Sequence, residues 1–312
     1  MVMIESGRPP LALIAGPTAS GKSSLALALA ERTGGVLINA DSAQVYRDLP
    51  ILSAGPAETD LARAEHRLYG LIDGALPCSA ADWAAMARRE ITDVQAGGRL
   101  PILVGGTGLY LRTLLDGIAP VPPIDPEIRR TIRSREVATN HAQLQSLDPE
   151  AAARLRPTDT TRVARALEVV TSTGRTLADW QKQREGGISE TVELRPLVLL
   201  PPRQWLHERC NARFAQMVKD GAVEEVRALL ARNLDPDLPV MRAIGVREIA
   251  VYLRGDSDLE QSIALGQQAT RQYAKRQYTW FAHQPPASWP RFAEPLDAQT
   301  IGTALELLGA KA

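Results

Sequence analysis

The sequence predicts an α/β protein in which a parallel sheet is flanked by helices, with an all-helical domain inserted into it. Two observations lead to this prediction. Continuous apolar runs alternate with helical segments in the first third of the chain, which is typical of parallel strands buried on both faces. Strand signals then disappear after the proline-rich break "APVPPIDPEIRR" and return only at "LRPLVLLPP".

The first part of the core, residues 1–119, contains the clearest strand and helix signals. Helices are predicted over 23–33 and 79–98, where apolar residues recur with helical spacing. Buried strands bounded by glycine or proline are predicted over 10–16, 34–40 and 99–106, with a weaker edge strand over 67–73.

The helical insertion is predicted over residues 120–195, and residues 196–312 complete the core with C-terminal helices. The returning strand lies within 194–202 and leads into a long amphipathic helix over 203–232. Further helices carry "MRAIGVREIAVYL" and "QQATRQYAKRQYTWFA".

Composition excludes several classes of protein. The 36 basic and 36 acidic residues balance, so a polyanionic partner must meet local basic patches. The only cysteines, Cys78 and Cys210, lie far apart in the sequence, which favours a reducing compartment and no disulfide framework. The N-terminus "MVMIESGRPP" has no secretion signal, and no apolar run approaches the roughly 18 residues of a membrane helix. We expect a cytoplasmic protein without membrane association.

The stretch "GPTASGKSS" lies between the first strand and the first helix and meets the spacing G-x-x-x-x-G-K-S. In such a loop, backbone N–H groups and the helix N-terminus face a phosphate, the lysine adds charge and the serine hydroxyl can bind Mg²⁺. Lys22 is also the only lysine before Lys182. We therefore predict a P-loop NTPase-like core that binds phosphates through Gly16, Thr18, Ala19, Ser20, Gly21, Lys22 and Ser23, with Ser23 as the metal ligand.

Two further strands end in different polar groups. "NADSAQVYR" puts Asp41 at a carboxyl end, and "PILVGGTGLY" ends in backbone donors and Thr107 without a carboxylate. A nucleotide hydrolase normally has an acidic residue there to hold magnesium. This pattern indicates that the phosphate leaves and another atom is attacked. Taken alone, Asp41 would more often be a helix cap and Thr107 a turn residue.

Several segments, in this order, resemble the tRNA dimethylallyltransferases, also called tRNA isopentenyltransferases. They are "GPTASGKS", "DSAQVY", "LVGGTGLY", "TRVARALEV", "RCNAR", "RAIGVRE" and "ATRQYAKRQYTWF", and the resemblance covers residues 11–283. It implies transfer of a dimethylallyl group from dimethylallyl diphosphate to the N6 amine of the adenosine 3′-adjacent to the anticodon, with release of diphosphate. Because the chain lacks the Cys/His finger of eukaryotic relatives, we expect a bacterial-type enzyme.

The resemblance also implies catalytic roles. Asp41 would accept or orient a proton of the amine, and Thr107 would hydrogen-bond near the bridging oxygen. Arg213 would join the phosphate-binding loop and Mg²⁺ in holding the diphosphate. Arg209 lies four residues before Arg213 on the same helix face, and an exposed salt bridge is the alternative for either arginine.

A tRNA anticodon stem-loop needs a wider surface, because its target base must leave the stack. Basic and aromatic residues interleave in "TRQYAKRQYTWF", which suits phosphate contacts and base stacking, although we expect Trp280 and Phe281 to be core residues. The insertion would act as a tRNA-contacting arm. RNA contacts are expected at Asp41, Ser42, Ala43, Gln44, Thr107, Arg129, Arg162, Arg165, Arg242, Gly245, Arg247, Arg271, Lys275 and Arg276.

Two positions depart from the family pattern, and other functions stay open. Gly55 in "ILSAGP" replaces a lysine, and Thr161 in "TDTTR" replaces a glutamine.

A P-loop small-molecule kinase explains the loop but leaves the basic-aromatic helix without a role. An adenylate-type isopentenyltransferase is disfavoured by the insertion, and a non-enzymatic RNA-binding switch leaves Asp41 and Thr107 unexplained. We expect a monomer.

Overall fold

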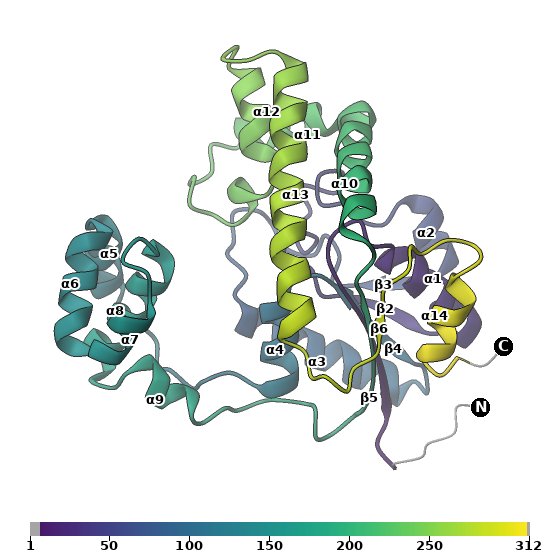
Figure 1. Ribbon diagram of the computed structural model, residues 1–312, viewed down its shortest axis with the longest axis horizontal. Coiled ribbons are helices and arrows are strands. Elements are labelled where there is room, and N and C mark those ends of the chain that lie inside the picture. The colour runs from purple at the N-terminus through teal and green to yellow at the C-terminus, as the bar shows by residue number, and fades with distance from the viewer. Residues whose placement is uncertain (1–6, 311–312) are drawn as a thin grey trace. The chain divides into compact units, whose positions relative to one another are not determined.

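In a computed structural model, which describes residues 7–310, six parallel strands form one sheet (Figure 1). The strand order is β3-β2-β4-β1-β5-β6. This arrangement confirms the predicted α/β class. The strands are β1 (Pro10–Ala15), β2 (Val36–Asn39), β3 (Glu65–Arg67), β4 (Pro101–Gly105), β5 (Glu193–Leu199) and β6 (Arg291–Phe292).

The centre of the sheet is apolar on both faces. Strand β1 lies between β4 and β5, and Ala12 is in register with Ile102 on one side and Arg195 on the other. Leu11, Leu13 and Ile14 are completely buried. Burial of these continuous apolar runs stabilises the sheet and explains why the sequence shows no polar alternation there.

Three helices connect the strands of the first part of the core, α1 (Lys22–Thr33), α2 (Glu58–Arg63) and α3 (Ala80–Ala96), and a fourth, α4 (Gly108–Asp116), follows β4. Helix α3 begins with a capping box between Ser79 and Asp82. Its Trp83 is fully buried and donates a hydrogen bond from Nε1 to the Asn39 carbonyl at 2.9 Å. Helix α3 therefore holds the end of β2 in place.

The C-terminal helices are α10 (Arg203–Met217), α11 (Val223–Ala231), α12 (Val246–Leu253), α13 (Leu259–His283) and α14 (Ile301–Leu307). Helix α13 packs along α10 and α12 (Figure 1). The prediction of a single helix over 203–232 is wrong, because a short π-helical turn, Val218–Ala222, joins α10 to α11. Within it, Gly221 has a φ of 109°, which interrupts regular helix geometry.

Residues Leu115–Gly187 form a separate compact unit of helices. Its helices are α5 (Pro126–Ser134), α6 (Val137–Leu147), α7 (Pro149–Arg154), α8 (Thr160–Thr173) and α9 (Leu177–Gln181). Ile132, Leu144 and Leu167 belong to its own apolar core. The sequence placed the insertion at 120–195, but β5 already begins at Glu193.

Other sequence predictions near the edge of the sheet need correction. The strand predicted over 67–73 ends at Arg67, because Leu68 adopts a left-handed φ of 64°. The short elements α2, β6 and α14 have no counterpart in the prediction.

Residues 1–6, where the sequence shows no secretion signal, lie outside the described range. Across residues 7–310, every helix is too short or too polar to cross a membrane.

Candidate active site

Three neighbouring strands bring the predicted polar groups to one edge of the sheet. Strand β4 pairs with β1 on one side and with β2 on the other. The phosphate-binding loop follows β1, Asp41 follows β2 and Thr107 follows β4. Ligands of open parallel sheets bind at this carboxyl edge.

The phosphate-binding loop, residues 16–23, needs glycine at both ends of its turn. Gly16 has a φ of 150°, and a Cβ there would lie 2.5 Å from the Leu199 carbonyl oxygen. Gly21 has a φ of 96°, and a Cβ there would lie 2.9 Å from a methyl group of Leu296. Between them, Ala19 adopts a left-handed φ of 62°. These values account for the glycine spacing that marks the loop in the sequence.

The polar side chains of the loop have unsatisfied capacity for an anion. Lys22 donates from Nζ to the Pro17 carbonyl at 2.6 Å. Burial lowers the pKa of Lys22 to about 8; the nearby Asp41 carboxylate opposes this shift and Arg213 adds to it. Ser20 is buried, and its hydroxyl has no hydrogen-bond partner within residues 7–310. This hydroxyl can therefore donate a hydrogen bond to a bound anion.

Asp41 and Thr107 each accept a hydrogen bond from a backbone N–H of the loop that follows β2. The Asp41 carboxylate accepts a bond from the Ala43 N–H at 3.0 Å, and the Thr107 hydroxyl accepts one from the Ser42 N–H at 3.0 Å. The side chain of Tyr273 in α13 lies close to that of Thr107. Burial and the Asp41 carboxylate raise the pKa of Tyr273, so it stays a neutral phenol.

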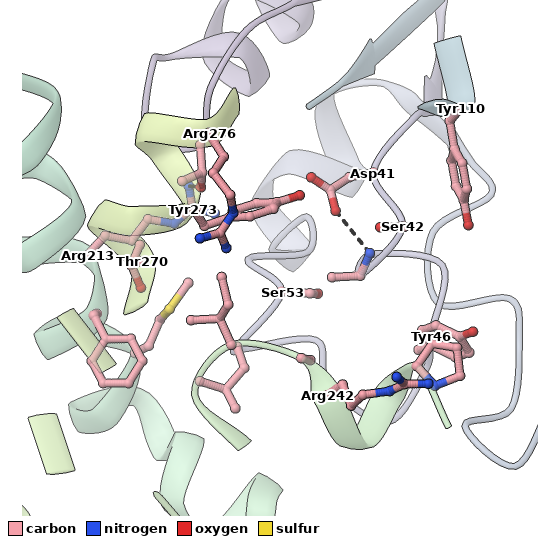
Figure 2. A pocket seen from close by; sticks show the side chains of 18 of the residues that line it. Asp41, Ser42, Tyr46, Ser53, Tyr110, Arg213, Arg242, Thr270, Tyr273 and Arg276 are labelled. Atoms are coloured by element: carbon pink, nitrogen blue, oxygen red, sulfur yellow. Dashed lines mark hydrogen bonds between the residues drawn. The ribbon is translucent and has the colours of Figure 1, made fainter. Parts of the chain in front are cut away.

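A cavity of about 330 Å³ opens beside these groups (Figure 2). Asp41 and Tyr273 point toward each other in it, with Arg276 close by. The polar part of its lining includes Thr18, Asp41, Ser42, Arg213, Arg242 and Arg276, and the apolar part includes Leu52, Phe214, Met217, Pro239 and Ile244. The cavity can therefore hold a ligand with an anionic end and an apolar end.

The two arginines of "RCNAR" have different places. Arg213 lines the cavity and donates from Nη1 to the Thr18 hydroxyl at 3.4 Å. Burial lowers the pKa of Arg213, and the Asp41 carboxylate partly offsets this shift. Arg209 instead donates from Nε to the Ala19 carbonyl at 3.0 Å and lies over the Trp205 ring. Arg213 is thus the arginine of this pair that faces the cavity.

Among the residues expected to contact RNA, Ser42, Ala43, Arg242 and Arg276 line the cavity together with Asp41. Gln44 is not part of this lining. Its Nε2 donates to the carbonyls of Ser53 at 3.0 Å and Ala54 at 2.7 Å, beside Gly55. Gln44 therefore shapes the loop from which Leu52 and Ser53 reach the cavity.

The remaining expected RNA contacts of the larger unit lie outside the cavity lining. Gly245 has a φ of 99°, and a Cβ there would lie 2.6 Å from a methyl group of Leu52, so its role is to allow a tight turn. Arg271 hydrogen-bonds to Asn211 of α10. Arg247 and Lys275 are exposed.

In the helical insertion, three arginines surround one buried carboxylate. Glu168 is completely buried. Its oxygens lie 2.8 Å from Nε of Arg133, 3.7 Å from Nε of Arg129 and 3.8 Å from Nη1 of Arg165. The three arginine side chains are 38–59% exposed, so their outer faces are available. At the start of α8, the expected Arg162 pairs with Asp159 at 3.4 Å. Thr161, which departs from the family pattern, is exposed beside it.

Sequence reasoning missed Gln277 of α13. Thr270, Tyr273 and Gln277 follow the i, i+3, i+7 spacing of one helix face, and the first two line the cavity. The basic residues chosen from the sequence do not share one face, since Arg276 lines the cavity and Arg271 faces α10. Phe281 is fully buried, as expected.

In this parallel sheet the phosphate-binding loop follows β1, and the acidic residue Asp41 follows β2, with β4 lying between the two strands. This combination defines a P-loop protein that handles a phosphorylated substrate. The family model described as "IPP transferase" matches residues 44–284. The chain therefore belongs to the IPP transferase family.

Curated relatives agree with this assignment. A tRNA dimethylallyltransferase of Sphingopyxis alaskensis is 62% identical over 292 residues, which cover 93% of this chain and 95% of the relative. A protein of the same name from Erythrobacter litoralis is 60% identical over 91% of each chain.

Solved structures are similar along most of the chain. A tRNA isopentenylpyrophosphate transferase of Bacillus halodurans matches with a TM-score of 0.69 and 32% identity, covering 97% of each chain. A eukaryotic dimethylallyltransferase acting on tRNA matches with a TM-score of 0.74 and 28% identity, covering 87% of this chain and 69% of that one.

Proposed function

We propose that this protein transfers a dimethylallyl group from dimethylallyl diphosphate to the N6 amine of the adenosine 3′-adjacent to the anticodon of tRNA. One observation carries the proposal. Asp41 and Arg213 line the same cavity, and Arg213 bonds to Thr18 of the phosphate-binding loop. An anion site and a base in one cavity suit a reaction in which diphosphate leaves as an amine attacks. The names of the relatives agree with this chemistry.

The loop and Arg213 would hold the diphosphate. Lys22 and Arg213 supply positive charge, and the free hydroxyl of Ser20 supplies a donor. These groups would stabilise the negative charge that the leaving group gains as the bond between carbon and oxygen breaks. Thr107 would hydrogen-bond near the bridging oxygen.

Asp41 would act at the other end of the transferred group. The N6 amine attacks C1 of the dimethylallyl group, an N–C bond forms, and the C1–O bond breaks with its electron pair leaving on diphosphate. The amine then loses a proton, which Asp41 accepts. The bonds from Ala43 to Asp41 and from Ser42 to Thr107 fix both groups before the substrates bind.

Magnesium would be held largely by the substrate. No group of three or more His, Cys, Asp or Glu side chains within residues 7–310 could bind a metal ion. The exposed Ser23 at the start of α1 offers one hydroxyl ligand, which fits Mg²⁺ because this ion usually keeps waters and binds substrate phosphates. When bound, it would offset part of the diphosphate charge.

The tRNA would be held by two basic surfaces. Arg242 and Arg276 at the cavity would contact the anticodon loop, with Arg247, Arg271 and Lys275 further out on the same unit. Arg129, Arg162 and Arg165 would make the helical insertion a tRNA-contacting arm. A tRNA substrate would place the enzyme in the cytoplasm, and we expect the enzyme to act as a monomer.

The test is transfer of radiolabel from dimethylallyl diphosphate to bulk tRNA in the presence of Mg²⁺. Wild type should label tRNA, and both Asp41→Ala and Lys22→Ala should lower the rate by about 10²-fold or more, since a general base typically contributes 10²–10⁴. Asp93→Ala removes an exposed carboxylate of α3 and should leave the rate unchanged. Label in AMP instead of tRNA, or ATP consumption without RNA, would refute the proposal.

A further inference from the structure

Gln277 is a buried polar side chain that the proposed chemistry does not use. It lies in α13 and is 5% exposed. Its Oε1 accepts a hydrogen bond from the Thr18 N–H at 2.8 Å, and its Nε2 donates one to the Gly106 carbonyl at 2.9 Å. The first partner can only donate and the second can only accept, so together they fix the orientation of the amide.

The two partners of Gln277 belong to opposite sides of the site. Thr18 lies in the phosphate-binding loop, and its hydroxyl accepts a bond from Arg213. Gly106 immediately precedes Thr107, whose hydroxyl is bonded to the Ser42 N–H. One side chain therefore joins the loop that would hold the leaving group to the strand end that faces Asp41.

Gln277 and Gly106 lie so close together that no side chain would fit at position 106 without displacing the amide. A Cβ at Gly106 would lie 2.3 Å from Nε2 of Gln277 and 3.1 Å from the Gly16 carbonyl oxygen. Three residues further along α13, Trp280 packs so closely that a Cβ at Gly108 would lie 2.5 Å from its ring. Gly106 and Gly108 thus let α13 approach the strand end, where Gln277 forms both of its bonds.

We propose that Gln277 is a positioning residue, which sets the distance between the diphosphate-binding loop and the Asp41–Thr107 pair. This inference rests on the proposed function, because its effect is on the transfer step. Reaction rates depend steeply on such distances: a displacement of about 1 Å can lower the rate by about 10²-fold. Gln277 is not among the residues that line the cavity, so it would act through Thr18 and Gly106.

Two substitutions separate positioning from packing. Gln277→Leu keeps the volume of the side chain but loses both bonds. Gln277→Glu keeps the acceptor for the Thr18 N–H, and only its protonated form can donate to the Gly106 carbonyl. Gln272→Glu makes the same chemical change at an exposed position of α13 and serves as the control.

The test measures kcat and KM for both substrates, the pH dependence of kcat, and binding of inorganic diphosphate by calorimetry. We expect Gln277→Leu to lower kcat by about 10²-fold, with KM values and diphosphate affinity within about threefold of wild type. For Gln277→Glu we expect kcat to recover toward wild type as the pH falls and the new carboxyl group gains its proton. Wild type and Gln272→Glu should not show this recovery.

Three results would overturn the inference while wild type still transfers label to tRNA. The first is a kcat for both Gln277 variants that stays within about threefold of wild type. The second is a loss of diphosphate affinity that accounts for the whole effect. The third is a Gln277→Glu variant whose kcat shows no recovery at low pH. If Gln277→Leu does not fold, the pH profile of Gln277→Glu decides alone. Absence of transfer by wild type would instead contradict the proposed function.

Discussion

The Thr107 hydroxyl accepts a hydrogen bond from the Ser42 N–H at 3.0 Å and lies 3.3 Å from the Ser42 hydroxyl. These bonds connect the end of β4 to the loop that carries Asp41. The Tyr273 side chain of α13 also lies close to Thr107. Thr107 is therefore the residue at which the end of β4, the loop after β2 and α13 meet.

Thr107→Val should lower kcat by about 10-fold to 10²-fold, because the variant keeps the shape of the side chain but removes the hydroxyl from the transition state. It also leaves the Ser42 N–H without its partner, which should lower the free energy of unfolding by about 1–3 kcal/mol. Thr107→Ser should keep most of the activity. Steady-state kinetics with thermal unfolding check this, and Thr92→Val on the exposed face of α3 is the control. A Thr107→Val enzyme as active as Thr107→Ser would contradict the role of the hydroxyl.

The affinity for dimethylallyl diphosphate should fall as the pH rises above about 8. Burial lowers the pKa of Lys22 from its ordinary 10.5 to about 8, so the free protein loses this positive charge above that pH. An anion binds the charged form, and the loss therefore weakens binding. The same shift in the pKa of Lys22 has the opposite effect on the free energy of unfolding, which rises with pH where the affinity falls. Between about 8 and 10.5 the unfolded chain holds more protons at this site, so stability rises with pH.

Calorimetric titration with dimethylallyl diphosphate between about pH 7 and 9.5 measures this effect. Lys22→Met should bind more weakly and lose the dependence that begins near pH 8. Lys182, which is exposed and pairs with Asp179, provides the matched control Lys182→Met. A wild-type affinity that stays constant across this range would show that Lys22 is not the charge that binds the diphosphate.

Much of the fold could be predicted because it depends on local signals. The strand before the loop, the glycines at 16 and 21 and the helix after them are adjacent in the sequence, so their spacing reveals both structure and chemistry. The break at Gly221 was missed because a glycine in a helical pattern is often tolerated, and only its φ of 109° shows that the helix changes direction there.

The contacts of α13 with the site could not be predicted in the same way. Gln277 is 259 residues from Thr18 and 171 from Gly106, and no local pattern reports pairings at such separations. The basic residues of α13 can be recognised in the sequence by their charge alone. The face that reaches the cavity is set by packing against α10 and α12, so it becomes visible only in three dimensions.

Glu168→Gln should weaken tRNA binding through the arginines around it. The buried carboxylate holds Arg129, Arg133 and Arg165, and a neutral amide would leave their charges to repel one another. We expect a loss of about 1–3 kcal/mol of stability in the helical insertion, below the value for a fully buried pair because the arginines are partly exposed. We also expect the KM for tRNA to rise several-fold while the KM for dimethylallyl diphosphate stays unchanged.

Kinetics at several salt concentrations measure this effect, because phosphate contacts depend on ionic strength. Glu150→Gln, at an exposed position of α7, makes the same change without disturbing the cluster and should behave as wild type. If Glu168→Gln lowers the thermal stability but leaves the KM for tRNA unchanged at every salt concentration, the three arginines do not contact tRNA.

Gly106→Ala and Gly302→Ala should have opposite effects on stability. At Gly106 the new methyl group would lie 2.3 Å from Nε2 of Gln277, so α13 or the strand end must move, at a cost of about 1–3 kcal/mol. At Gly302, in α14, no atom lies within 4 Å of the added Cβ, and alanine should stabilise the helix by up to about 1 kcal/mol. Thermal unfolding of both variants checks the signs. The kcat of Gly106→Ala should also fall while that of Gly302→Ala stays unchanged. An active and stable Gly106→Ala protein would mean that Gln277 can leave Gly106 without consequence, because the methyl group and the amide cannot occupy the same space.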